Sequence, residues 1–342
     1  MKKRSVLFLV SLPIAAISLI FLLLSRKNSL FASIINASVG ARLRSALLSV
    51  SNSVPFSLFE LLIVFSPAAF VLLIYSFRNK GKAALRRRFL SVIGVFLLIF
   101  SIFINTLVIG YGVDIKVQEM SVGKTELSLT LEYLSEKINS LDNITYPDSE
   151  LLSKKLFDSY KSLDFPQLSL TKVQPKFKKI KSSGLASRLG ILGSYSFLTS
   201  EINVNLSAPA YTVPFSAAHE MAHLFGISGE AEASFLAYCA SVESKDTGIM
   251  YSAYLSAFEY VGGELLYQNR DLYFEKFSSL SEKAKSDIAE YRRFYIDNHS
   301  DITDSSNKIN GELLDFVDKN GDTAYSAFTY LLVSHLISEN AL

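Results

Sequence analysis

This chain has very little cysteine, no tryptophan and almost no excess of charge of either sign. Among its 342 residues there are one cysteine, no tryptophan and a formal net charge of only +2. The single cysteine, Cys239, excludes an intrachain disulfide framework and a cysteine-rich metal site. The nearly balanced charge removes the electrostatic basis for binding nucleic acid, so we expect no nucleic acid as a partner.

Hydrophobic residues, in contrast, make up 49% of the chain and are concentrated near its N-terminus. Three apolar runs, at residues 6–24, 58–77 and 89–109, each have about 20 residues, enough for a helix to cross the ~30 Å hydrocarbon layer of a bilayer. We therefore predict a membrane domain over residues 1–112 with three transmembrane helices and with the lipid bilayer as a partner.

The basic residues around these runs predict how the chain is oriented. The N-terminal "MKKR" and the segment "RNKGKAALRRR" at residues 78–88 are both strongly basic, and basic segments stay on the cytoplasmic side of a membrane. This places the loop at residues 25–56 and everything after residue 112 outside. The "MKKR" start also fits a signal peptide, but the first apolar run is longer than usual and no clear cleavage site precedes Arg26.

Residues 113–342 are predicted to form one extracytoplasmic domain that is mainly helical. Residues 190–206 ("GILGSYSFLTSEINVNL") differ, because apolar and polar residues alternate there and Ile202, Val204 and Leu206 fall on one face. We expect a small sheet at this point, in a mainly α protein whose soluble part is an α+β domain. The strand that ends at Leu206 would suit an extended peptide, which adds to a sheet as one more strand.

The most specific motif is "HEMAH", from His219 to His223, which has the pattern H-E-x-x-H. Residues four apart lie on one face of a helix, with Cβ atoms about 5–6 Å apart, so two imidazoles can bind one Zn²⁺. Glu220 is turned by about 100° around the helix from His219, which places it beside the metal as a general base for a zinc-bound water. Ser216 can serve as the N-cap of this helix, and Gly226 as the glycine that ends it.

A third metal ligand is needed, and Glu230 and Glu232 are both candidates. In a second helix over residues 230–242, Glu230 shares a face with small residues, so that face can approach the first helix closely. These small residues are Ala233, Ser234 and Ala237. Glu232 points about 200° away from Glu230 and would support the site from outside the ligand set or lie at the surface. We therefore favour Glu230 with the two histidines and a water, which is a catalytic arrangement.

The remaining candidate residues have weaker signals. The segment "GIMYSAY" carries Tyr251 and Tyr254, whose hydroxyls would stabilise an oxyanion if they reach the metal; the competing interpretation is that they are core tyrosines. We expect His299 at the surface and His335 in or near the core, rather than as ligands. Cys239 is interpreted as a small buried residue rather than a nucleophile.

Several segments resemble an uncharacterised bacterial membrane-protein family that is catalogued as domain of unknown function 3810, and the resemblance covers nearly the whole chain. The segments are "PFSLFELL" (55–62), "NTLVIGYGVD" (105–114), "FLTSEINVN" (197–205), "VPFSAAHEMAHLFGISGEAEASFLAY" (213–238) and "MYSAYL" (250–255). More remotely, "EAEASFLA" is similar to the E-x-E-A-N/D helix of gluzincin peptidases, a resemblance that implies a zincin-like fold.

The gluzincin resemblance also implies roles for individual residues. It implies His219, His223 and Glu230 as zinc ligands and Glu220 as the base, in agreement with the helical geometry. Ser234 stands where those peptidases usually have Asn or Asp, a side chain that orients a ligating histidine. Serine can make the same hydrogen bond, although its side chain is shorter.

Together these observations predict a membrane-anchored zinc metallopeptidase of the bacterial cell membrane. It would be a multi-pass protein with a cytoplasmic N-terminus and an extracytoplasmic zincin-like domain, acting on a peptide or protein substrate through a zinc-activated water. The alternative is a zinc-binding membrane protein that recognises or senses a peptide without cleaving it. A third hypothesis is a degenerate structural protein that binds no zinc.

Overall fold

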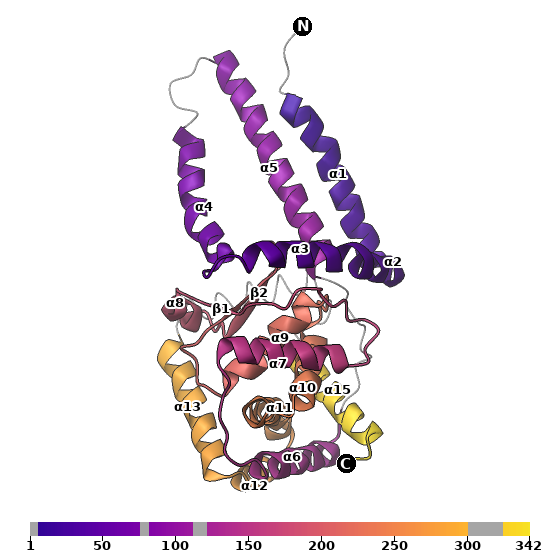
Figure 1. The fold of residues 1–342 in the computed structure, drawn as a ribbon, viewed down its shortest axis with the longest axis vertical. Coiled ribbons are helices and arrows are strands. Elements are labelled where there is room, and N and C mark those ends of the chain that lie inside the picture. Colours follow the sequence, from indigo (N-terminus) through magenta and orange to yellow (C-terminus); the bar gives the residue numbers. More distant parts are fainter. Residues whose placement is uncertain (1–5, 76–81, 112–121, 300–323) are drawn as a thin grey trace.

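The structure is a computed structural model of the chain, and it describes residues 6–75, 82–111, 122–299 and 324–342. Long apolar helices stand on one side of a layer of short helices, and a mainly helical domain with a small sheet lies on the other side (Figure 1). The predicted domain boundary at residues 112 and 113 falls outside the described residues.

The long helices are α1 (Val6–Lys27), α4 (Leu58–Tyr75) and α5 (Lys82–Tyr111), and all three extend away from the sheet (Figure 1). Helices α1 and α5 pack along each other, and the side-chain amide of Asn105 donates to the hydroxyl of Ser18 at 2.9 Å. The first and last of the predicted apolar runs therefore form a pair of packed helices.

Two helices in the described part of the chain are long and apolar enough to cross a membrane, where we predicted three. They are Val6–Ser25 and Arg88–Thr106. The run predicted at residues 58–77 forms α4, but the apolar segment described there, Leu58–Ala68, is shorter than the ~20 residues that a crossing needs. The third predicted span is thus corrected to a shorter apolar helix.

The basic segment at residues 78–88 is helical over much of its length. Residues 82–88 form the first two turns of α5, and residues 78–81 lie outside the described part of the chain. The described part of this basic segment is therefore continuous, in one helix, with the apolar span that follows it.

The layer below the long helices replaces the loop predicted at residues 25–56. It consists of α2 (Ser29–Ile35), a π-helical turn η1 (Asn36–Gly40) and α3 (Ala41–Ser51). Along α3 the residues at positions 44, 48 and 51 are buried, which is the i, i+4, i+7 spacing of one helix face. That face packs on the rest of the domain, and its Leu48 belongs to the main hydrophobic core.

The predicted small sheet is present and has three strands, β1 (Lys178–Lys179), β2 (Gly193–Ser196) and β3 (Glu201–Val204). The order is β1-β3-β2, with β1 parallel and β2 antiparallel to β3. Our expectation that the second strand of this region, β3, would accept a peptide is therefore wrong, because both of its edges are already paired. The edge of the sheet next to the helix that carries His219 and His223 belongs to β2.

The helices of the domain surround one hydrophobic core, with α11 packed against α6, α9 and α10 (Figure 1). Their bounds are α6 (Lys124–Asn139), α7 (Ser149–Ser162), α8 (Ser183–Arg188), α9 (Thr212–Leu224), α10 (Glu230–Glu243), α11 (Thr247–Gln268), α12 (Arg270–Ser278), α13 (Glu282–Asn298) and α15 (Ala324–Ser338). The mainly α character predicted from the sequence is confirmed for the described residues.

Polar contacts join the sheet to the layer of short helices and to α4. The buried carboxylate of Glu201 on β3 accepts hydrogen bonds from the backbone N–H groups of Leu58 (3.0 Å) and Phe59 (2.9 Å), at the first residues of α4. A carboxylate at this position satisfies unpaired N–H groups and the positive end of the helix dipole. Lys178 on β1 donates to the carbonyl oxygen of Ser51 at 3.0 Å. The sheet is therefore joined by direct polar contacts both to the short helices and to α4.

Candidate metal centre

The hairpin formed by α9 and α10 carries the H-E-x-x-H motif. Helix α9 begins at Thr212, one turn before the predicted N-cap Ser216, so that prediction is wrong. Pro214 is tolerated there because the first turn of a helix has no intrahelical partner for its missing N–H. The helix ends at Leu224, and Gly226 follows with φ +89°, the left-handed conformation predicted for the glycine that ends it.

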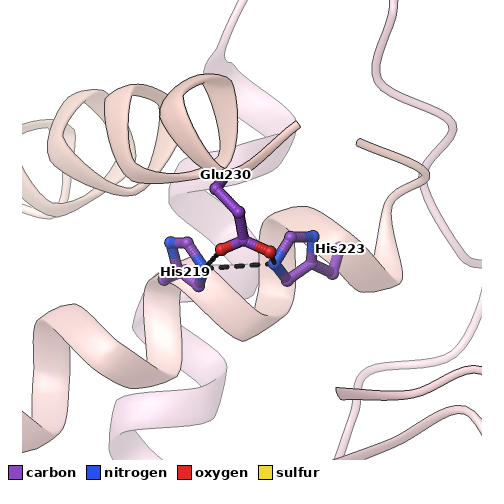
Figure 2. A group of neighbouring side chains, drawn as sticks. All are labelled: His219, His223 and Glu230. Atoms are coloured by element: carbon purple, nitrogen blue, oxygen red, sulfur yellow. Dashed lines mark hydrogen bonds and ion pairs between the residues drawn. The ribbon is translucent and has the colours of Figure 1, made fainter. Parts of the chain in front are cut away.

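His219, His223 and Glu230 meet in the fold of this hairpin (Figure 2). The Nε2 atoms of the two histidines are 3.1 Å apart, and one carboxylate oxygen of Glu230 lies 3.0 Å from Nε2 of His219. The other carboxylate oxygen is 3.6 Å from Nε2 of His223. One potential ligand atom from each residue lies within 4.8 Å of the others, so the structure brings together all three predicted ligands.

Hydrogen bonds from outside the cluster orient both imidazoles. Nδ1 of His223 lies 2.7 Å from the carbonyl oxygen of Ile227, so this nitrogen is the donor. Nδ1 of His219 lies 3.1 Å from the hydroxyl oxygen of Ser234. These contacts direct both Nε2 atoms toward Glu230 and are the kind of outer hydrogen bond that holds ligating histidines. Ser234 thus contacts one of the two candidate ligating histidines, the role that the resemblance implies for its position.

The donor atoms suit a zinc ion in number and spacing. Two nitrogens bound to a tetrahedral Zn²⁺ at about 2.0–2.1 Å lie about 3.3 Å from each other. The observed separations of 3.1 and 3.0 Å within the cluster differ from this by a few tenths of an ångström. Two imidazoles and one carboxylate are also the ligand set of many catalytic zinc sites, which keep a further position open. The residues present therefore fit the predicted ion.

The histidines and the carboxylate of the cluster each stabilise the charged form of the other. Burial alone would lower the pKa of His223, but the adjacent Glu230 carboxylate outweighs burial and raises this pKa to about 9. In turn, burial would raise the pKa of Glu230, but the two histidines hold it well below its usual range. The cluster therefore attracts positive charge strongly, and a metal that binds there must displace a proton from His223.

Glu220 lies beside the cluster and is buried, with 9% of its surface exposed. Burial raises the pKa of its carboxyl, against the opposing influence of both neighbouring histidines and of a hydrogen bond from the backbone N–H of Tyr195. Gly193 makes room for it, because a Cβ at that position would lie 2.9 Å from Cγ of Glu220. The candidate base is thus held against strand β2.

The outer edge of β2 faces the same carboxylate. The backbone N–H of Asn205 donates to the carbonyl of Leu192 at 2.8 Å, which makes these two residues a hydrogen-bonded pair of the antiparallel ladder. Because such pairs alternate, the backbone N–H and C=O groups of Gly193 and Tyr195 point away from β3. Sequence analysis missed these two residues, since their role depends on the order of the strands.

Glu232, the other candidate for the third ligand, lies outside the cluster. It is the third residue of α10, and its carboxylate folds back against Gly229, the residue that precedes the helix. A glutamate at this position commonly supports the start of a helix. Of the two glutamates, only Glu230 is placed with the histidines.

The predicted tyrosines are joined to other parts of the domain. The hydroxyl of Tyr251 donates to Asp287 of α13 at 2.5 Å, and the ring of Tyr254 packs edge-to-face on Tyr238 with centroids 5.9 Å apart. Both are buried, at 0% and 3% exposure. These contacts match the competing interpretation, core tyrosines, and the structure gives no support to a catalytic role for either.

The other singled-out residues lie where the sequence placed them. His299 is exposed at the end of α13, and His335 packs its ring on Phe235 at 5.5 Å. Burial raises the pKa of the Cys239 thiol to about 12, so this cysteine is not a nucleophile at neutral pH.

Comparison with known proteins identifies a family but no characterised relative. Residues 40–333 match the family described as "Protein of unknown function (DUF3810)". The matched segment begins at the last residue of η1, so it includes α3, α4, α5 and the whole cluster. No curated protein and no solved structure matches the chain.

Proposed function

We propose that this chain, which belongs to the DUF3810 family of proteins of unknown function, is a membrane-anchored zinc metallopeptidase with a zincin-like domain. The observation that carries the proposal is the convergence of His219, His223 and Glu230 beside the buried carboxylate of Glu220. When bound there, Zn²⁺ would supply a Lewis acid that lowers the pKa of a water and polarises a peptide carbonyl. The similarity of the α10 segment to the gluzincin helix agrees with this assignment of ligands.

Glu220 would move the proton. Its raised pKa makes its carboxylate a stronger base than an exposed glutamate, and a base works best when its pKa approaches the working pH. The carboxylate would accept a proton from the attacking water and deliver it to the departing amide nitrogen. The N–H of Tyr195, which donates to this carboxylate, would keep it oriented.

Strand β2 would hold the substrate. Its backbone groups at Gly193 and Tyr195 point away from β3, in the direction in which a further strand adds to a sheet, and the N–H of Tyr195 already donates to Glu220. A peptide that pairs with them runs past Glu220, next to the metal ligands. The backbone of the substrate, rather than particular side chains, would therefore supply much of its binding energy.

We further propose that the protein lies in the bacterial cell membrane with the cluster outside the cell. The first residue of α1 and the basic first turns of α5 both lie at the end of the molecule far from the sheet (Figure 1). Basic ends on one side favour that side as cytoplasmic, which places the domain on the other.

The test uses the chain of residues 1–342 in detergent, with metal analysis and cleavage of a mixed peptide library. We expect one zinc per chain, and we expect Glu220→Gln to keep the zinc but lose about 10²–10⁴-fold in hydrolysis, the usual contribution of a general base. Glu136→Gln, the same change at an exposed site on α6, is the control and should leave both properties unchanged. Zinc-loaded protein that hydrolyses equally well with Glu220→Gln would reject the proposal.

The second candidate is zinc-dependent peptide recognition that signals through the membrane without hydrolysis. It is favoured by α5, a continuous helix of 30 residues that runs from the basic segment to the domain and contacts α9. If the protein signals in this way, Glu220→Gln should have no effect on its function in cells. Neutralising the basic residues at 86–88 should have the same effect on cells as deleting the protein.

A further inference from the structure

Arg44 on α3 is fully buried, with 0% of its surface exposed. Its guanidinium donates to three oxygens that are distant in the sequence. They are the side-chain oxygen of Asn36 (2.7 Å) and the carbonyl oxygens of Ile109 (3.1 Å) and Ser169 (3.2 Å). One side chain thus joins the π-helical turn, the last turn of α5 and the segment before β1.

The acceptors of Arg44 are connected in turn to the end of the metal-ligand helix. The side-chain amide of Asn36 donates to the carbonyl oxygen of Gly226 at 3.0 Å, and the N–H of Ser169 donates to the carbonyl oxygen of Phe225 at 2.8 Å. A Cβ at Gly226 would collide with the Asn36 amide. The turn after α9 is therefore fitted closely against Asn36.

The next carbonyl in the same turn binds a metal ligand. The carbonyl oxygen of Ile227 accepts the hydrogen bond from Nδ1 of His223 at 2.7 Å. Three successive carbonyls, from Phe225 to Ile227, are thus all in use: two face the Arg44 contacts, and the third orients an imidazole. A shift of this turn would change the direction of the His223 ring.

Helix dipoles explain why a positive charge occupies this place. All three acceptors of Arg44 are neutral oxygens, so no carboxylate in these contacts offsets the cost of burying the guanidinium. The C-terminal end of α5 contacts it directly through the carbonyl of Ile109, and the end of α9 lies one side chain away, because the carbonyl of Gly226 is bonded to Asn36. Helix C-termini carry partial negative charge and stabilise a cation. An apolar side chain would leave these carbonyls without a donor.

We propose that Arg44, acting through Asn36, is a positioning residue for His223, and that it makes the geometry of the metal cluster depend on where the end of α5 lies against α3. The inference rests on the proposed metal binding, because its main consequence is a change in metal affinity. The inference also makes α3 and α5 part of the support of the metal site. Residues 113–342 alone would lack Asn36 and Arg44, and with them part of the support of His223.

The test compares variants of the chain by titration of the metal-free protein with Co²⁺, followed through its visible absorption. Outer contacts of metal ligands usually contribute 10–100-fold to affinity, so we expect Arg44→Met and Asn36→Ala each to weaken Co²⁺ binding by about 10-fold or more. Arg42→Met changes an exposed arginine on the same helix and should bind like the unmodified chain. Arg44→Lys keeps the charge but not the fork of donors and should recover part of the loss.

Leu48→Ala separates positioning from general destabilisation. Leu48 is buried one turn along α3 from Arg44 and belongs to the core, so its truncation should lower the melting temperature without weakening Co²⁺ binding. If Leu48→Ala weakens binding as much as Asn36→Ala does, or if Asn36→Ala and Arg44→Met bind normally, the inference is overturned.

A second readout needs no metal, so failure of the proposed function remains distinguishable. The N–H groups of Gly226 and Ile227 are bonded to the carbonyls of His223 and Ala222. In the metal-free chain, Asn36→Ala should accelerate hydrogen exchange in this turn by about 10-fold relative to α11, while Leu48→Ala should leave that ratio unchanged. An unmodified chain that binds no Co²⁺ but shows this pattern would reject the metal site and keep the positioning role; normal exchange with Asn36→Ala would reject the positioning role.

Discussion

The hairpin of α9 and α10 is held from two sides by different interactions. On the side of α11 most contacts are apolar, and many of the residues are small: Ala233, Ala237 and Ala253 are fully buried, as is the large Phe258. A few hydrogen bonds also cross there, such as that from the N–H of Phe215 to the hydroxyl of Ser252 at 2.9 Å. On the side of the long apolar helices the contacts are mainly hydrogen bonds, from Asn36 to the turn after α9 and from α4 to the sheet. We call the first the apolar side and the second the polar side.

The two kinds of contact contribute differently to the stability of the hairpin and to the exact position of its residues. Apolar contact has no preferred direction, and its free energy grows with the area removed from water, so it stabilises the hairpin without fixing the last few tenths of an ångström. Hydrogen bonds contribute less free energy each, but they weaken steeply when the donor and acceptor are misaligned. We therefore expect changes on the apolar side to lower stability most, and changes on the polar side to act more on geometry.

The largest effect on stability should come from Phe258→Ala on the apolar side. Phe258 is fully buried on α11, and removing a buried phenylalanine ring leaves a cavity that costs about 3–5 kcal/mol. Phe274→Ala is the control, because that ring is 46% exposed and its loss should cost less than about 1 kcal/mol. Thermal or denaturant unfolding of both variants checks the difference, and equal losses would contradict a core centred on α11.

An intermediate effect is expected from Glu201→Gln on the polar side. A glutamine offers one acceptor oxygen where the carboxylate now serves Leu58 and Phe59 through both, so the unfolding free energy should fall by about 1.5–3 kcal/mol. Glu60→Gln is the matched control: Glu60 accepts the N–H groups of Lys181 and Ser182 across the same boundary, but at an exposed site. We expect less than about 1 kcal/mol there. A larger loss with Glu60→Gln would mean that burial does not decide the strength of these contacts.

The smallest effect should be a dependence on pH from a carboxyl on the apolar side. Burial raises the pKa of Glu259 to about 7, although hydrogen bonding from Tyr211 and the charge of Arg292 act to lower it. The neutral form is therefore favoured in the folded state, and its contribution to stability is complete below about pH 4.5 and lost as the pH rises through about 7.

Glu259→Gln, which stays neutral, should match the unmodified chain near pH 4 and exceed it in unfolding free energy at pH 8. Melting temperatures at the two pH values check this. A gain of the same size at both would show that the carboxyl does not titrate in this range.

The residues of the candidate site could be found from the sequence because their signal is local. The spacing of His219 and His223 and the small face that accompanies Glu230 both follow from the period of a helix. The left-handed Gly226 follows from the same reasoning, since a helix that reverses quickly needs a residue without a Cβ. The structure gathers these residues as the pattern predicts.

What sequence analysis missed depends on residues that are far apart in the chain. Arg44 lies in the predicted outer loop at residues 25–56, and nothing near it in the sequence shows that its guanidinium would bond to carbonyls 65 and 125 residues away. The edge position of β2 depends on β1, a strand of two residues with no periodicity of its own. The run at residues 58–77 was taken as a third span from its composition alone, which reveals neither the described extent of α4 nor the carboxylate of Glu201 at its start.

In the proposed membrane orientation, the lengths within α5 set how far the metal cluster lies from the bilayer. The apolar part of the helix, Arg88–Thr106, has 19 residues and is about 28 Å long, close to the ~30 Å of a bilayer interior. Ile109, which accepts a hydrogen bond from Arg44, follows only three residues later, about 5 Å further along the axis. In that orientation no stalk separates the bilayer from the turn after α9, so this turn would lie at the level of the lipid headgroups and a substrate would reach it along that plane.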